Sequence, residues 1–297
     1  THRRCKDCGH VFLDPYPPDA ILRLLYSGQY YTQYRELFER PRLQRGNNEM
    51  PFSAPLDLLN RIIDRATGTR EDGAWLDTGG GLGALADLVR QKRPGWSVAI
   101  NDLNPRSIEI AKETFGIETL GDDAATLVRS ERRFDVLSAI AVLEHVPEPA
   151  KYIEAYAKLL NPRGLFVVLV PHFTRLSGLV SRASSPAAAP PFHVNLFNKE
   201  SLSNLLNRSR LFETIEIFDR GAPAFSLMHH IDFADYFDIT IPTVEDPEPR
   251  TVMLKPYDEV TGQRIATLAE ADKTLNSYFA ETDGGINLIA IAQTAGR

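Results

Sequence analysis

Residues 75–84 read Trp-Leu-Asp-Thr-Gly-Gly-Gly-Leu-Gly-Ala, and this stretch decides the fold. Its apolar start predicts a buried strand that ends at Asp77, and residues 85–89 take up the apolar spacing of a helix. The four glycines between 79 and 83 let the backbone pass close to a ligand while the helix N-terminus points at it. A turn between a strand and a helix needs only one or two glycines, so this loop favours a nucleotide-type cofactor.

The acid before the glycines separates two kinds of cofactor. Gly79, Gly81 and Ala84 satisfy G-x-G-x-x-A, so a dinucleotide such as NAD is formally allowed. A carboxylate at Asp77 would repel a pyrophosphate, yet it suits a ligand with an ammonium group and no phosphate, such as S-adenosylmethionine. The stretch resembles the first motif of the class I S-adenosylmethionine-dependent methyltransferases, an acid followed by G-x-G-x-G, which Asp77, Gly79, Gly81 and Gly83 match.

Composition narrows the class of protein. The chain has 297 residues, 43% hydrophobic and 24% charged, which is ordinary for a globular protein with one large core or two domains. A net charge of −6 argues against a nucleic-acid partner. The sequence shows neither a membrane span nor a secretory signal, and two cysteines are too few for a disulfide framework. We therefore expect a cytoplasmic protein, monomer or homodimer, with no membrane or nucleic-acid partner.

The N-terminal region, residues 1–50, begins with a cysteine knuckle. Cys5 and Cys8 form a C-x-x-C-G turn that can present two thiolates to one metal ion, but zinc prefers four ligands and a second C-x-x-C is absent from the sequence. Three interpretations stay open: half of a zinc ribbon, a reduced structural turn, or a working site. We predict no bound metal.

Tyrosines 26, 30, 31 and 34 follow the knuckle and a proline-rich segment. They are typical of a packing edge, or of a lid whose phenols line the cofactor or substrate; as a lid, Tyr30 and Tyr31 would contact the substrate. The whole segment resembles the N-terminal extension of many bacterial small-molecule methyltransferases, in which the extension often carries a zinc knuckle.

From residue 74 onward strand and helix signals alternate, which predicts a Rossmann-like α/β fold. We expect a doubly wound, mostly parallel seven-stranded sheet with an antiparallel edge hairpin, the last strand lying next to the fifth. The predicted strands are 74–77, 96–101, 118–120, 134–140, 165–170, 211–218 and 286–292, and the main helices are 51–67, 82–91, 105–115, 149–160 and 199–209. Residues 161–164 are predicted as a turn. The methyltransferase domain then comprises 51–220 plus 285–297, and 221–284 form an insertion covering the active site.

Two further acids follow predicted strands. Asp102 ends the second strand, where a carboxylate can accept both ribose hydroxyls; its alternative is an acid at a helix N-terminus. Asp122 follows the third strand and either accepts the adenine amino group or caps a helix; in the methyltransferases a G-D-A type motif stands here. The predicted cofactor-binding residues are Asp77, Gly79, Gly81, Gly83, Asp102, Leu103, Asp122, Asp123 and Ile140.

The stretch 134–147 carries a more specific resemblance. It reads Phe-Asp-Val-Leu-Ser-Ala-Ile-Ala-Val-Leu-Glu-His-Val-Pro and resembles the F-D…V-L-E-H-V motif of the ubiquinone-biosynthesis O-methyltransferase branch. Residues 159–164 resemble that branch's L-L-x-P-G-G turn, and Pro171, His193 and Phe197 match its P…H…F pattern. A second glutamate commonly stands in that branch where this chain has Ala141, in a set associated with a divalent ion. The sequence therefore predicts metal-independent transfer.

The resemblance implies methyl transfer from S-adenosylmethionine to a small molecule. The acceptor is expected to be a sugar, a nucleotide-linked sugar, or a phenolic or polyketide metabolite, methylated on oxygen or carbon. A hydroxyl acceptor needs a base, for which we favour His193, with His145 as its rival or as a positioning group. Each histidine has a purely structural alternative. The rival functions are an NAD-dependent oxidoreductase and a non-catalytic cofactor-binding partner subunit.

Overall fold

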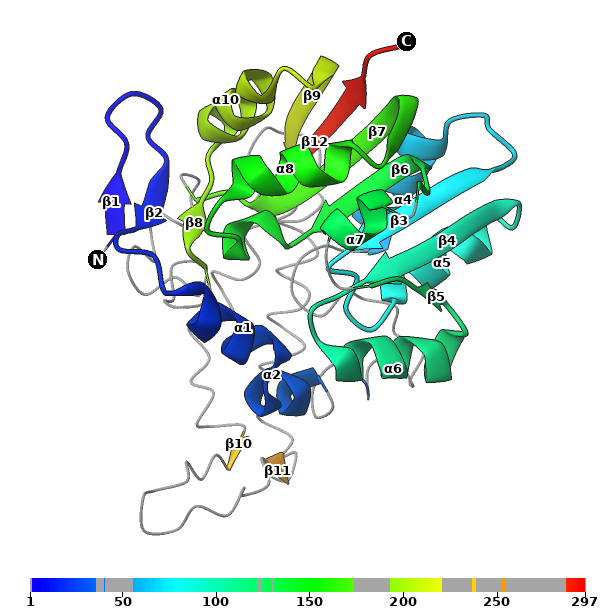
Figure 1. Cartoon of the computed structure of the whole chain (residues 1–297), viewed down its shortest axis with the longest axis horizontal. Helices are drawn as coiled ribbons and strands as arrows, with labels where there is room; N and C mark the ends of the chain where they lie inside the picture. Colours follow the sequence, from blue (N-terminus) through cyan, green and yellow to red (C-terminus); the bar gives the residue numbers. More distant parts are fainter. Residues whose placement is uncertain are drawn as a thin grey trace, which may run out of the picture.

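A single seven-stranded sheet organises the protein (Figure 1). The computed structural model describes residues 2–35, 40, 56–121, 124–129, 131–173, 193–220, 237–238, 253–254 and 287–296. The strand order is β5-β4-β3-β6-β7-β12-β9. The strands are β3 (Gly73–Thr78), β4 (Trp96–Asn101), β5 (Glu118–Thr119), β6 (Phe134–Ile140), β7 (Leu160–Pro171), β9 (Phe212–Arg220) and β12 (Asn287–Thr294).

The predicted topology is confirmed. β12 lies between β7 and β9 and pairs antiparallel with both, whereas β3 to β7 pair in parallel. The last strand is thus inserted next to the fifth one, and it forms an antiparallel pair with β9 at the edge. Parallel strands end at the same edge of a sheet, so the loops after β3, β4 and β6 are gathered there.

Helices cover both faces of the sheet because its central strands are apolar on both sides. Leu59 and Leu85 pack with Trp75 on one face, whereas Ile153 and Leu202 pack with Leu76 on the other. The first face carries α4 (Leu56–Thr67), α5 (Ala84–Lys92) and α6 (Pro105–Phe115), and the second carries α7 (Ala124–Arg129), α8 (Pro149–Ala157) and α10 (Lys199–Ser209).

Residues 161–164 are part of β7, and the prediction of a separate turn before the strand is wrong. Leu160 pairs with Phe134 and Leu165 pairs with Val136, so the residues between them form an irregularity within the strand. Arg163 takes the left-handed conformation there, with φ of 61°. The backbone stays in the sheet because it also forms a hydrogen bond with the residues after β12. The amide of Arg163 donates to the carbonyl oxygen of Ala295 at 3.2 Å.

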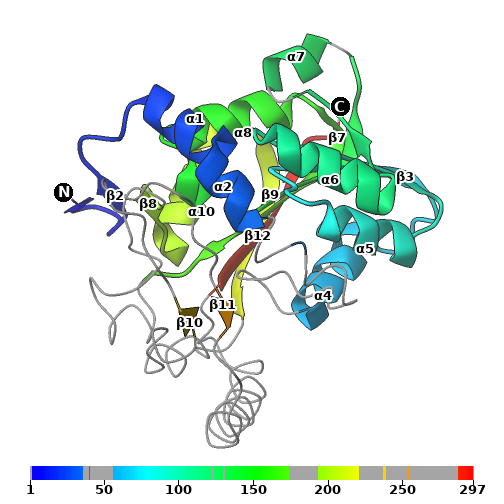
Figure 2. The same cartoon turned by 90° about the horizontal axis from the view of Figure 1, so that it is seen from below.

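The N-terminal extension has its own small sheet, which the sequence did not predict. β1 (His2–Arg4) and β2 (Val11–Leu13) form an antiparallel hairpin, and β8 (Asn195–Leu196) pairs with β2. Two helices follow the hairpin, α1 (Asp19–Ser27) and α2 (Gln29–Tyr34). Figure 2 shows them crossing toward α6, with α2 beside it in both views.

The predicted insertion, residues 221–284, falls almost entirely outside the described residues. Only β10 (Phe237–Asp238) and β11 (Met253–Leu254), which pair with each other, belong to the described part. Its role as a cover of the active site stays a prediction. Among the helices in the described ranges, none has the length and apolar character needed to cross a membrane.

Candidate active site

The glycine loop joins β3 to α5 in a conformation that favours glycine. Gly79, Gly81 and Gly83 have φ of 65°, 57° and 82°, in the left-handed region. A Cβ on Gly79 would lie 2.7 Å from Cγ2 of Val142, and one on Gly81 would lie 2.5 Å from Nη1 of Arg35. The loop therefore requires glycine both for its backbone conformation and for close approach.

Asp77 lies buried beneath this loop and is 2% exposed. The hydroxyl of Ser138 donates to its Oδ1 at 2.6 Å, and the indole N–H of Trp75 donates to the same hydroxyl oxygen at 2.8 Å. Burial raises the pKa of Asp77 to about 7; the Ser138 hydrogen bond opposes this shift, and the nearby charge of Asp102 adds to it. The Asp77 carboxyl therefore changes its protonation near neutral pH.

Asp102 holds the glycine loop and the following turn. Its Oδ2 accepts from the amide of Gly81 at 2.9 Å, and its Oδ1 accepts from the amide of Asn104 at 2.8 Å. The cap of α6 is Asn104, whose side chain accepts from the amide of Ser107, so Asp102 is not the helix cap. Leu103, between them, is 39% exposed.

Arg35, at the end of α2, is a site residue that sequence reasoning missed. Its guanidinium lies 3.9 Å from Oδ2 of Asp102, donates to the hydroxyl of Tyr31 at 3.3 Å and lies 4.7 Å from the centre of the Tyr31 ring. The only signal in the sequence is the helical spacing of four residues between Tyr31 and Arg35.

A cluster of titratable side chains follows β6. Ala141 takes a left-handed turn, with φ of 55°, before the 3-10 helix η2 (Leu143–His145). The rings of His145 and His193 are 4.7 Å apart, and Oε1 of Glu144 lies 3.8 Å from Nε2 of His145. The hydroxyl of Tyr26, from α1, is 2.7 Å from Nδ1 of His145. Val142 lies between this cluster and the glycine loop, since its side chain is the one that faces Gly79.

Two members of this cluster have raised pKa values. Glu144 is 1% exposed, and burial raises its pKa to about 8. Burial also raises the pKa of Tyr26 far above the usual value, and the neighbouring Tyr31 adds to the shift. At neutral pH the Tyr26 phenol is therefore protonated, and Glu144 is largely so.

The small N-terminal sheet holds His193 beside η2. The amide of Val194 donates to the carbonyl oxygen of Glu144 at 2.8 Å. Asn195 donates to the carbonyl oxygen of Val146 at 2.6 Å, and its own Oδ1 meets the Tyr16 hydroxyl and Nε2 of His10, both at 3.0 Å. The contacts of Asn195 with Tyr16 and His10 join segments more than 170 residues apart, and no local pattern in the sequence indicates them.

The sequence model of a family described as "Methyltransferase domain" matches residues 49–211, more than half of the chain. The chain belongs to this methyltransferase domain family. The predicted membership in the class I methyltransferases is thereby confirmed, together with the seven-stranded sheet that it implies.

Curated relatives of this methyltransferase include ubiquinone biosynthesis O-methyltransferases. The one from Neisseria meningitidis is 31% identical over 97 residues, 30% of this chain and 40% of that protein. The one from Leptothrix cholodnii is 30% identical over 122 residues, 37% of this chain and 51% of that protein. The matches thus span about half or less of the length of these relatives.

Solved structures agree on the fold. A S-adenosylmethionine-dependent methyltransferase from Archaeoglobus fulgidus matches with a TM-score of 0.52 at 16% identity, over 90% of this chain and 100% of that one. Phosphoethanolamine N-methyltransferase 2 from Haemonchus contortus matches with a TM-score of 0.55 at 17% identity, over 95% of this chain and 62% of that one.

The residues of the methyltransferase loop fit S-adenosylmethionine. The backbone of Gly79 and Gly81 forms a cradle that side chains approach closely, Val142 at Gly79 and Arg35 at Gly81, and the lack of a Cβ would let a ligand approach it in the same way. Asp77 and Asp102 lie beside this cradle with acceptors suited to an ammonium group and to ribose hydroxyls. Ile140, also predicted at the cofactor, is 5% exposed and packs in the core.

Several predicted residues stay untested. Asp122 and Asp123 lie outside the described residues, as does the side chain of Tyr30. Tyr31 contacts Arg35 and Tyr26, so it does belong to the segment that covers the loop.

The cysteine knuckle is the turn of the β1–β2 hairpin in this methyltransferase. Cys5 and Cys8 are free, partly exposed thiols, and the side chain of Asn198 donates to the carbonyl oxygen of Cys8 at 3.0 Å. Across the described residues, the group of three metal-ligating side chains that the structure contains is Glu144, His145 and His193, whose ligand atoms lie within 4.8 Å of one another. The role of the knuckle in zinc binding stays a prediction.

Proposed function

We propose that this methyltransferase moves the methyl group of S-adenosylmethionine to a hydroxyl of a small molecule, with His193 as the base. The observation that supports it most is the contact between His145 and His193, whose ring centres are 4.7 Å apart. His145 comes three residues after Val142, whose side chain faces Gly79 of the loop. The loops at this sheet edge bind ligands in doubly wound folds. The O-methyltransferase names of the relatives point to the same acceptor atom.

The chain's own residues have distinct roles in this proposal. The cofactor, when bound, supplies a methyl group on a positively charged sulfur. Asp77, the loop glycines, Asp102 and Leu103 hold it, with Ile140 below. The acceptor lies between the loop and the histidines, so that alignment of nucleophile and methyl group lowers the barrier by several kcal/mol.

The hydrogen bond of Tyr26 favours His193 over His145 as the base. In the arrangement that we propose, the protonated Tyr26 phenol donates its O–H to Nδ1 of His145 across 2.7 Å. The neutral imidazole of His145 then carries its proton on Nε2. His145 therefore orients its neighbours, and His193 accepts the proton of the hydroxyl.

The test of this role is turnover with a true acceptor under saturating cofactor. Changing His193 to Ala should lower kcat on the order of 10²-fold or more and leave the affinity for S-adenosylhomocysteine unchanged. His145→Ala should lower kcat by a smaller factor. Full turnover in both variants would contradict the proposal. Absence of turnover by the wild-type protein on sugars, nucleotide-linked sugars, phenols and polyketides alike would favour the partner-subunit alternative, and stabilisation by NAD would favour the oxidoreductase.

We also propose that the transfer needs no divalent ion. Mg²⁺ and similar ions prefer several oxygen ligands, and Glu144 is the one carboxylate in the described group with His145 and His193. Position 141 carries alanine, which offers no ligand. We expect turnover to survive EDTA. Because Glu144, His145 and His193 can bring ligand atoms within 4.8 Å, titration with Mg²⁺, Mn²⁺ and Zn²⁺ is the decisive measurement. Activity that EDTA removes and one of these ions restores would refute metal independence.

The proposal also covers the class of acceptor, the cellular location and the oligomeric state. A sugar, a nucleotide-linked sugar, or a phenolic or polyketide metabolite all suit a base at this edge, and C-methylation is the alternative outcome of the acceptor assay. Cytoplasmic localisation and a monomeric or homodimeric state stay predictions from composition.

A further inference from the structure

Ser138 places a hydroxyl group in an apolar layer of the sheet. It lies on β6 directly beside Asp77 of β3, and Figure 1 shows these two strands next to each other. Its neighbours along β6 and across to β7 on the same face are the apolar residues Val136, Ile140 and Val167. Because Ser138 is fully buried, its hydroxyl needs hydrogen-bond partners inside the protein.

Two hydrogen bonds fix the direction of this hydroxyl. The indole N–H of Trp75, which is also fully buried, donates to Oγ of Ser138 at 2.8 Å, and Ser138 donates to Oδ1 of Asp77 at 2.6 Å. An indole nitrogen can only donate, and a serine hydroxyl has a single proton to give. Trp75 therefore directs the proton of Ser138 at Asp77, and the hydrogen bonds inside the sheet use Oδ1 of that carboxyl group.

The charged and titratable groups near Asp77 come from three other elements. Asp102, after β4, disfavours a second negative charge at Asp77, and Arg35, at the end of α2, lies 3.9 Å from Asp102. On the opposite face of the sheet, Tyr152 of α8 donates to the hydroxyl of Thr78 at 2.6 Å, and burial keeps the pKa of this phenol well above its usual value. Helices α4 and α5 contribute apolar side chains to the face of Trp75. The Ser138 hydrogen bond thus favours the charged form of Asp77, and burial and Asp102 oppose it.

A proton on Asp77 and an ammonium group compete for the same oxygen. Since Ser138 donates to Oδ1, a proton that Asp77 holds in its neutral form sits on Oδ2. A protonated Oδ2 and an ammonium group are both donors, so they cannot form a hydrogen bond with each other. The ammonium group of the cofactor therefore needs the ionised carboxylate.

We propose that Ser138 is a positioning residue that keeps Oδ2 of Asp77 for the ammonium group of S-adenosylmethionine, so that cofactor binding releases a proton to water. The proposal rests on the cofactor, and not on the acceptor or the base of the proposed function. By favouring the charged carboxylate, the Ser138 hydroxyl sets the pH above which the cofactor binds tightly. Trp75 supports this role because its N–H prevents the hydroxyl from turning away from Asp77.

The test compares two ligands that differ only in the amine. Titration calorimetry measures S-adenosylhomocysteine and its deaminated analogue, which keeps the carboxylate, the thioether and the adenosine. The ionised fraction of a carboxyl group with a pKa of about 7 rises about tenfold from about pH 6 to about pH 8. The wild-type affinity for S-adenosylhomocysteine should rise by the same factor, and the affinity for the analogue should stay constant.

Proton release is measured directly by repeating the titrations in two buffers that differ in ionisation enthalpy. Near pH 7, S-adenosylhomocysteine should release about half a proton per molecule bound, because about half of Asp77 is protonated at a pH equal to its pKa. The deaminated analogue should release almost none.

Ser138→Ala removes the hydroxyl and should leave Asp77 protonated up to a higher pH. A hydrogen bond to a charged group shifts its ionisation by about one to two pH units. The affinity of this variant for S-adenosylhomocysteine should therefore be about 5- to 50-fold below wild type near pH 7 and within about twofold of it near pH 9. Its affinity for the analogue should equal that of the wild type at both pH values. Ser138→Thr keeps a hydroxyl group and should restore the wild-type pH profile.

Ser97→Ala is the matched control, since it removes the hydroxyl of another strand serine. Ser97 lies on β4, where its exposed hydroxyl donates to the carbonyl oxygen of Gly73 at 3.4 Å. This variant should bind both ligands as the wild-type protein does at each pH. Thermal unfolding verifies that every variant is folded.

Three results would overturn the proposal. A wild-type affinity for S-adenosylhomocysteine that does not change with pH would mean that binding releases no proton. The same pH dependence for the deaminated analogue would assign the proton to a group that does not meet the amine. Equal weakening of both ligands by Ser138→Ala at every pH would mean that Ser138 only supports the loop. Failure of the wild-type protein to bind either ligand at any pH would instead overturn the cofactor of the proposed function.

Discussion

At the scale of the residue, Asp77 makes stability depend on pH. Its folded-state pKa of about 7 lies above the usual value of 3.8, so between these two values the folded state keeps a proton that the unfolded state releases. The free energy of unfolding therefore falls as pH rises through this window and levels off above it. In Asp77→Asn this dependence should disappear. The difference in the free energy of unfolding between variant and wild type should therefore change by about 2–3 kcal/mol from about pH 5 to about pH 8.

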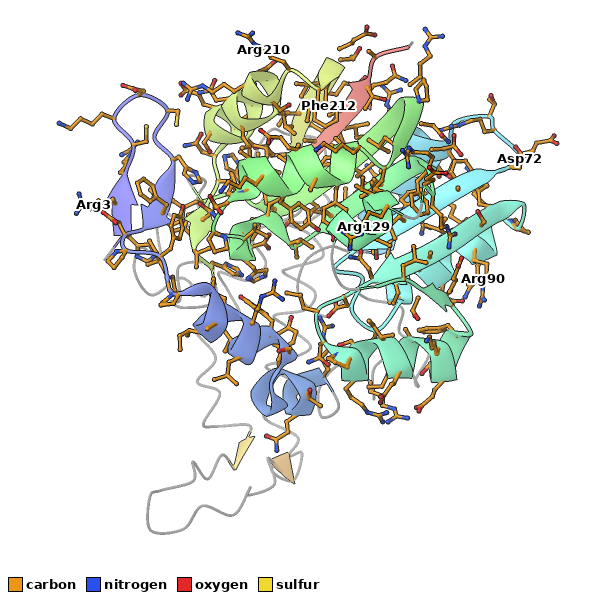
Figure 3. The ribbon with its side chains drawn as sticks, viewed as in Figure 1. Arg3, Asp72, Arg90, Arg129, Arg210 and Phe212 are labelled. Carbon is orange, nitrogen blue, oxygen red and sulfur yellow. The ribbon has the colours of Figure 1, made fainter. Side chains whose placement is uncertain are left out.

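Urea unfolding at the two pH values measures this difference. Asp72→Asn, which alters an exposed carboxyl group in the turn before β3, is the control and should follow the wild type (Figure 3). If wild type and Asp77→Asn respond equally to pH, Asp77 does not hold its proton in the folded state.

Also at this scale, Gly81 should be needed for binding and not only for backbone conformation. Gly81→Ala places a methyl group 2.5 Å from Nη1 of Arg35, at the cradle of the cofactor. We expect at least a tenfold loss of S-adenosylhomocysteine affinity by calorimetry. Gly116→Ala is the matched control, because Gly116 has a similar φ of 63° with nothing within 4 Å. It should cost about 1 kcal/mol of stability and leave binding intact. If Gly81→Ala and Gly116→Ala bind S-adenosylhomocysteine equally well, the cofactor does not lie against Gly81.

At the scale of the element, α1 orients η2 through one hydroxyl. Tyr26→Phe removes the hydrogen bond to Nδ1 of His145 and keeps the edge-to-face ring contact, whose centres are 5.2 Å apart. We expect kcat to fall about tenfold, the equivalent of one neutral hydrogen bond, with a shifted pH–rate profile and unchanged cofactor affinity. Ser27→Ala, which alters the exposed side of the same helix, should retain full turnover. A normal pH–rate profile in Tyr26→Phe would exclude Tyr26 from orienting His145.

At the scale of the whole molecule, Asn195 joins the N-terminal extension to the sheet. Its amide contacts Tyr16, His10 and the carbonyl oxygen of Val146, so Asn195→Ala removes three long-range hydrogen bonds at a position that is 1% exposed. We expect a loss of about 2–4 kcal/mol in the free energy of unfolding and a fall in turnover, because His193 loses its support. Binding of S-adenosylhomocysteine should persist, because the glycine loop belongs to the other side of the site. Loss of binding in a folded Asn195→Ala protein would contradict this division.

Local signals determined most of the sheet and its helices. Strands 96–101 and 134–140 and helices 105–115 and 199–209 have the bounds that the sequence predicts. Their signals are apolar runs within each segment, and the structure adds asparagine caps at 104 and 198 that accept from backbone amides. The glycine loop and the acids after β3 and β4 are equally local, so the sequence by itself determined the class of cofactor.

Tertiary structure alone decided which side chains surround that loop. β8 is two residues long and pairs with β2, which lies more than 180 residues earlier in the sequence. No periodic pattern in the sequence predicts so short a strand. Tyr26 and Arg35 come from the N-terminal helices and His193 from a segment far along the chain, and they meet the loop and η2 only after the extension has packed on the sheet. A short segment has too few local interactions to specify its own conformation, and long-range contacts form only when the whole core has formed to hold them.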